Sequence, residues 1–169
     1  DGLTSLDDIF QRLLHIAASK AEQVQSQCSG STAAILCADT TIIVPHAELL
    51  DETYRVLGQP PEPEWREIVA EWFRTHYSGK THLAATAFVI TSPAGTFQGV
   101  VTTEVSMNAV SDSLLQWYLE TDEPRGKAGG YAIQGAGSMF ISGVRGSLSN
   151  VVGLPLREVR DALRHLRLV

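Results

Sequence analysis

Apolar residues recur three and four positions apart in four segments of the chain, and this spacing predicts four amphipathic helices. The helices are expected over about residues 5–27, 65–77, 111–121 and 155–166. Ser5 is a predicted N-cap of the first, with Asp8 as its acidic partner three residues on. Pro155 stands at a favoured first helical position of the last. The apolar face of that helix is predicted to consist of Leu156, Val159, Leu163 and Leu166.

Short apolar runs between these helices predict strands. One run covers 33–37, and a second run at 41–44 is either another strand or its continuation. Strands at 82–90 and 96–107 are joined by Ser92-Pro93-Ala94-Gly95, which is typical of a hairpin turn. A last strand is expected around 138–144, whereas 45–63 is expected to be a loop. Strands and helices interspersed in this way predict an α/β fold with a mixed, partly antiparallel central sheet flanked by helices.

Composition narrows the class of protein. A length of 169 residues fits one domain, and no apolar run is long enough to span a membrane. The net charge of −6 argues against a nucleic acid polymer as partner. The first residues lack the basic segment of a secretory signal, and Cys28 and Cys37 form no disulfide framework or metal-ligand spacing. We therefore expect a cytoplasmic protein with reduced thiols.

Asp39 interrupts the apolar stretch from Ala33 to Val44. A carboxylate in such surroundings is costly to bury unless it is paired, protonated or bound to a metal. At a strand end facing a cleft it could act as a base or a metal ligand. The alternative is a turn aspartate at a strand boundary, with Thr40 capping locally.

The three lysines stand at unusual positions. Lys20 falls on the apolar face of the first predicted helix, where it either extends its ammonium group to water or directs it at a phosphate. Lys80 immediately follows the end of the second predicted helix, and Lys127 lies in a glycine-rich stretch.

That stretch runs from Gly126 to Gly137. Glycine allows a positive φ and close approach of a ligand to the backbone, so a glycine-dense loop of this length indicates a small-molecule site. Gln134 offers a donor and an acceptor, which suits the edge of a nucleobase. Neither a G-x-G-x-x-G fingerprint nor a P-loop is present, and the five histidines have no metal-ligand spacing.

Together these segments resemble the Maf family of nucleoside-triphosphate pyrophosphatases over nearly the whole chain. The specific matches are Lys127 to Gly135 following Glu123-Pro124, and Asn150 to Pro155. The individually weaker matches are Ser19-Lys20-Ala21, Cys37-Ala38-Asp39-Thr40 and Ser78-Gly79-Lys80-Thr81-His82.

The resemblance implies one domain over residues 1–169, with two lobes, a nucleotide cleft and usually a dimeric state. It implies hydrolysis between the α- and β-phosphates to a monophosphate and pyrophosphate, with a divalent cation, Mg²⁺ or Mn²⁺. Asp39 would be the general base or a metal-linked carboxylate, and Lys20 would contact phosphate. Thr40 and Gln134 resemble the pair that reads a pyrimidine in the dTTP/UTP-type subgroup. The other implied nucleotide-binding residues are Lys127, which could serve phosphate or loop structure, Lys80 and Gln59.

Two departures from the family pattern stand out. The family's opening Ser-x-Ser-Pro-Arg-Arg has no counterpart here, and its Lys-Pro pair appears as Gln59-Pro60. We expect an upstream strand and loop to be missing from this chain. A nucleotide-binding regulator that has lost catalysis is the second hypothesis, and an interaction domain with the glycine segment as a packing device is the third.

Overall fold

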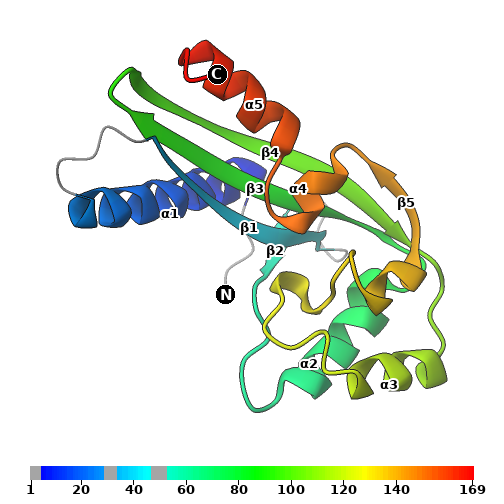
Figure 1. The fold of residues 1–169 in the computed structure, drawn as a ribbon. Coiled ribbons are helices and arrows are strands. Elements are labelled where there is room, and N and C mark those ends of the chain that lie inside the picture. The colour runs from blue at the N-terminus through cyan, green and yellow to red at the C-terminus, as the bar shows by residue number, and fades with distance from the viewer. Residues whose placement is uncertain (1–4, 29–33, 47–52) are drawn as a thin grey trace.

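The computed structural model describes residues 5–28, 34–46 and 53–169, and in these ranges five strands form one sheet in the order β2-β1-β3-β4-β5 (Figure 1). The strands are β1 (Ile35–Pro45), β2 (Tyr54–Leu57), β3 (Thr81–Ser92), β4 (Gly95–Met107) and β5 (Ile141–Arg145). The α/β class and the β3–β4 hairpin are confirmed, with Ser92 opposite Gly95 at the turn. Every described pairing is antiparallel, where a mixed sheet was predicted.

β1 is one continuous strand, so the two apolar runs are a strand and its continuation. Asp39 lies opposite Ala87 of β3 and Thr40 opposite Thr86, in an unbroken register. The interpretation of Asp39 as a turn residue is therefore wrong. β2 pairs with β1 only from Ile42 to Pro45. On that side, residues 35–41 of β1 have no neighbouring strand in the described part of the chain.

One face of the sheet is covered by α1 (Leu6–Gln27) (Figure 1). Its N-cap is confirmed, because the Ser5 side chain accepts a hydrogen bond of 3.2 Å from the amide of Asp8. The buried stripe of α1 packs on the inward residues of β1 and β3, removing apolar area from water on both sides. That cluster consists of Ile9, Leu13, Ala17, Ala21, Ile43, Ala85, Ala87 and Val89.

The remaining helices cover the opposite face in two groups. In Figure 1, α2 (Trp65–Trp72) and α3 (Asp112–Glu120) lie below one end of the sheet, and α5 (Leu156–His165) lies at the other. A π-helical turn, Phe73–Tyr77, extends α2 to the predicted end. None of the described helices combines the length and apolar character needed to cross a membrane.

Several local predictions require correction. β2 lies inside the predicted loop 45–63, of which 47–52 fall outside the described residues. β5 begins at Ile141 because a 3-10 helix occupies 136–140, and α4 (Leu148–Val152) was not predicted. Of the predicted apolar face of α5, Leu156 is 60% exposed, whereas Val159 and the C-cap Leu166 are buried with Ala162 and Leu163 packs against them.

Candidate functional site

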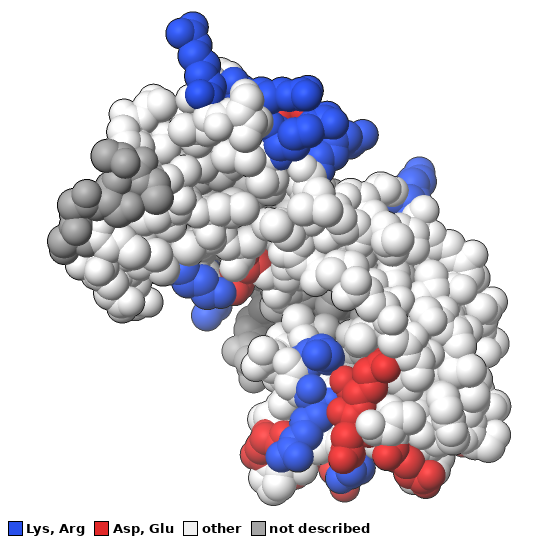
Figure 2. Space-filling view, in the orientation of Figure 1, with Lys and Arg blue, Asp and Glu red and all other residues white. Residues whose placement is uncertain are grey.

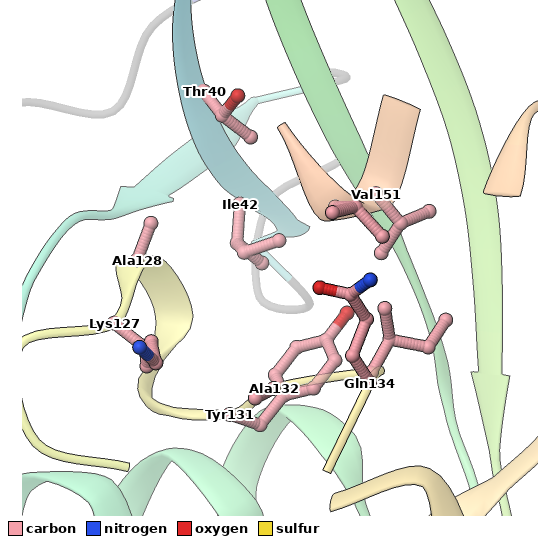
Figure 3. Close-up of a pocket in the computed structure, with 10 residues that line it drawn as sticks. Thr40, Ile42, Lys127, Ala128, Tyr131, Ala132, Gln134 and Val151 are labelled. Atoms are coloured by element: carbon pink, nitrogen blue, oxygen red, sulfur yellow. The ribbon is translucent and has the colours of Figure 1, made fainter. Parts of the chain in front are cut away.

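A pocket opens between the glycine-rich segment, β1 and α4 (Figure 3). Its walls are mainly apolar, with a few polar groups, as is typical of a small-molecule site. In Figure 3 the Gln134 amide points into the space beside Ile42 and Val151. The lining residues are Thr40, Ile42, Lys127, Ala128, Tyr131, Ala132, Ile133, Gln134, Val151 and Val152. The structure thus brings together three of the predicted residues, Thr40, Lys127 and Gln134.

The first half of the glycine-rich segment packs directly on β1. Gly129 has a φ of +73°, and a Cβ there would overlap Ile42 and lie 2.7 Å from the Tyr77 hydroxyl. That hydroxyl donates a 2.7 Å hydrogen bond to the Gly129 carbonyl. The amide of Gly129 donates to the Gly58 carbonyl at 2.9 Å. Only glycine combines this backbone conformation with this contact.

Thr40 is held against the same wall. Its Oγ1 lies 2.9 Å from Oγ1 of Thr86 and donates to the Gly153 carbonyl at 3.4 Å. These contacts position the hydroxyl group at the pocket edge.

Lys20 and Asp39 meet on the other face of the sheet. Successive residues of a strand point to opposite faces, so Asp39 faces α1 whereas Thr40 faces the pocket. The Lys20 ammonium forms an ion pair with Oδ1 of Asp39, and the two side chains are 48% and 24% exposed. The lysine therefore ends on a carboxylate rather than in free solvent. The pair and the pocket lie on either side of the same stretch of β1.

Gln59 and Lys80 do not line the pocket. Gln59 is exposed and follows Gly58, whose carbonyl accepts a hydrogen bond from the Gly129 amide of the glycine-rich segment. Lys80 Nζ donates to the carbonyl of Thr75 at 2.5 Å, at the end of the π-helical turn. In this structure Lys80 therefore caps the C-terminal end of that π-helical turn.

A buried aromatic cluster beneath the pocket was not predicted. His82 is 1% exposed, and its Nε2 lies 2.8 Å from the hydroxyl of Tyr131, a pocket-wall residue. No described group forms a hydrogen bond with His82 Nδ1. Burial lowers the pKa of His82 to about 4 and raises the pKa of Tyr131, so both groups are neutral near pH 7. The His82 match in the motif was the only sequence signal for this support.

His82 is expected to make the protein less stable as the pH falls. Its pKa is about 4 in the fold against 6.5 when unfolded, so below pH 6.5 the unfolded state binds the extra proton. Between pH 6.5 and 4, wild type should lose roughly 3 kcal/mol more unfolding free energy than His82→Gln. Urea unfolding of both proteins across this range measures the difference, and parallel pH curves would contradict the prediction.

Charged residues are unevenly distributed over the surface. Figure 2 shows lysine and arginine side chains gathered at the end that carries α5, and acidic side chains among basic ones at the end that carries α2 and α3. Between these ends the surface is hollowed, and basic atoms lie on both sides of the hollow.

The fold and the pocket define a class: an α/β domain with an antiparallel sheet, whose glycine-rich segment walls a small-molecule site on one face. The chain belongs to the Maf family, because the model of the Maf-like protein family matches residues 6–166. This confirms the resemblance inferred from the motifs.

Curated relatives are similar over most of the chain. A dTTP/UTP pyrophosphatase of Pyrococcus horikoshii is 35% identical over 92% of this chain and 76% of its own length. One of Anaeromyxobacter dehalogenans is 36% identical over 90% of this chain and 71% of its own. One of Myxococcus xanthus is 41% identical over 85% of this chain and 65% of its own.

Proposed function

We propose that this protein hydrolyses nucleoside triphosphates, with dTTP and UTP preferred, to the monophosphate and pyrophosphate. The observation that carries the proposal is the pocket in which Gln134 and Thr40 face one space across an apolar floor. Membership of the Maf family and the names of the relatives support it. These relatives give no support to the hypothesis of a regulator without catalysis.

The pocket is suited to the base. Gln134 supplies both a donor and an acceptor for the polar edge of a pyrimidine. Ile42, Val151 and Tyr131 offer apolar surface to the ring. The hydroxyl of Thr40 adds a further polar contact at the rim.

The triphosphate would leave the pocket across the edge of β1, where residues 35–41 have no described neighbouring strand on one side. This path leads from Thr40 to its neighbour Asp39 and to Lys20. There Asp39 would take a proton from the attacking water as an oxygen–phosphorus bond forms at the α-phosphate. The bond from that phosphorus to the bridging oxygen breaks, and pyrophosphate leaves. Lys20 would offset the negative charge on the phosphates, and Lys127, which lines the pocket, would add to this positive charge.

Asp39 is the carboxylate that we propose as a ligand of the divalent cation. The described residues hold no group of three or more histidine, cysteine, aspartate or glutamate side chains that could bind a metal. Mg²⁺ is commonly held by one or two carboxylates together with substrate phosphates. Asp39 keeps Oδ2 outside the Lys20 ion pair, so it suits a cation that arrives with the triphosphate. Such a cation would stabilise negative charge on the phosphates. A cytoplasmic homodimer remains part of the proposal.

Hydrolysis of a panel of triphosphates in Mg²⁺ or Mn²⁺ tests the proposal. Purified protein should release pyrophosphate fastest from dTTP and UTP and more slowly from dCTP, dATP and dGTP. Equal rates for all bases would contradict the base-reading role of the pocket, and absence of turnover with all of them would contradict the activity.

Gln134→Ala should weaken recognition of the base. Removal of the amide is expected to raise the KM for dTTP about tenfold, because one or two hydrogen bonds to the base are lost. The kcat should change less, since Gln134 does not reach the phosphates in this scheme. Steady-state kinetics on dTTP measures both parameters, with the exposed Gln116→Ala on α3 as control. Unchanged KM in Gln134→Ala would argue against the assignment.

A further inference from the structure

Glu123 follows α3 and binds the far half of the glycine-rich segment through its carboxylate. Its Oε2 accepts from the amide of Ala136 at 2.8 Å, and its Oε1 accepts from the amide of Gly137 at 2.9 Å. Oε1 also accepts from the Tyr118 hydroxyl at 2.9 Å. Three donors on one carboxylate make a strong, charge-assisted contact.

Tyr118 extends this network to the other side of Gln134. Its hydroxyl oxygen accepts from the amide of Ala132 at 3.2 Å, and its ring is fully buried. The residues before and after Gln134 are therefore both anchored, one flank by Tyr118 and the other by Glu123. The Gln134 side chain itself forms no hydrogen bond with any described residue. The anchored backbone therefore sets the point from which this side chain reaches into the pocket.

The glycines of this turn leave room for the network. A Cβ at Gly135 would overlap the Glu123 carboxylate, and one at Gly137 would lie 2.7 Å from the Tyr118 hydroxyl. Larger residues at either position would displace the groups that hold the turn. The glycines at positions 135 and 137 are thus explained by the space that the Glu123 carboxylate and the Tyr118 hydroxyl occupy.

Glu123 is ionised at neutral pH. Burial alone would raise the pKa of its carboxyl, but hydrogen bonds from Gly137, Ala136 and Tyr118 outweigh burial and lower it. A glutamine of the same length could accept through one oxygen only. Its NH₂ would face an amide N–H at the other position, so at least one anchor of the turn would be lost.

We propose that Glu123, acting with Tyr118, is a positioning residue that determines base selectivity by holding Gln134 at the pocket. This rests on the proposed function, in which the pocket receives the base. A pyrimidine with a C4 carbonyl and an N3–H presents the opposite pattern from cytosine, which has a C4 amino group and a bare N3. A Gln134 side chain that starts from an anchored backbone reaches these atoms at hydrogen-bonding distance and can distinguish the two patterns, whereas a displaced one binds both bases weakly.

The test is calorimetric titration with dTMP and dCMP, which requires no turnover. The proteins compared are wild type, Glu123→Gln, Tyr118→Phe and the control Glu104→Gln. Glu104 pairs with Arg145 between β4 and β5 and lies outside the pocket lining, so its variant has the same change of charge. Tyr118→Phe keeps the ring against Phe73 and Phe140 while removing the hydroxyl, which gives a second test if Glu123→Gln does not fold.

Wild type and Glu104→Gln should prefer dTMP, and this preference should fall about tenfold in Glu123→Gln and Tyr118→Phe. In kinetics, the KM for dTTP should rise about tenfold in both variants while kcat stays within about threefold, a split that general destabilisation would not produce. A folded variant that keeps the wild-type preference overturns the inference, as does a wild type that binds both monophosphates equally. A wild type that prefers dTMP but hydrolyses no triphosphate overturns the proposed activity and leaves the role of Glu123 in place.

Discussion

Asp39→Asn is expected to lower kcat for dTTP about a thousandfold, the largest effect of any single change on activity. An asparagine keeps the size and hydrogen-bonding shape of the side chain but cannot accept the proton of the attacking water. It also removes the negative charge from the partner of Lys20. Pyrophosphate release under saturating dTTP measures the loss.

Stability should change little in this variant. The Lys20 ammonium is half exposed and regains water, so the ion pair is worth about 1 kcal/mol or less. Asp112→Asn is the matched control, because Asp112 forms an exposed pair with Arg74 far from β1 in the sequence. A rate for Asp39→Asn within tenfold of wild type would remove Asp39 from the chemistry and leave the pocket as a binding site only.

Gly129→Ala is expected to cause the largest loss of stability, about 3 kcal/mol. Its Cβ would require an unfavourable positive φ and would overlap Ile42 beneath the pocket wall. For a chain of this length that loss lowers the melting temperature by roughly 9 °C. Thermal unfolding followed by circular dichroism provides the measurement.

Gly126→Ala separates the cost of the positive φ from the cost of the overlap with Ile42. Gly126 has a similar φ of +68°, but a Cβ there would meet nothing within 4 Å. Its variant should lose only the backbone term, about 1 kcal/mol. Equal losses in the two variants would mean that the contact of Gly129 with β1 contributes nothing, and the pocket wall would then be less closely packed than the structure indicates.

Local patterns predicted most of the fold because the elements they describe are long. α1, α3 and the β3–β4 hairpin each span enough residues for their period and their caps to be recognised. β2 and α4 have four and five residues, which is too short for a period to appear. The antiparallel character of the whole sheet depends on how distant strands pair, and local spacing contains no information on that.

The candidate site was predictable in part of its residues and not in its arrangement. Lys20, Asp39, Thr40 and Gln134 broke local patterns or matched motifs, so they could be singled out. The sequence left Asp39 either in a turn or on a strand. Its pairing with β3 shows that it lies within a strand, where alternation puts it on the opposite face from Thr40. Glu123 bonds to Ala136, 13 positions away, and His82 bonds to Tyr131, 49 positions away. No spacing rule reveals such contacts.

The central claim is hydrolysis of dTTP at the α-phosphate, with the base in the pocket beside Gln134. Its most direct test is phosphorus NMR of the products formed by wild-type protein from dTTP and Mg²⁺ or Mn²⁺. The account predicts dTMP and pyrophosphate in equal amounts, with neither formed by Asp39→Asn over the same time. Formation of dTDP and orthophosphate, or no product from the wild type, would contradict it.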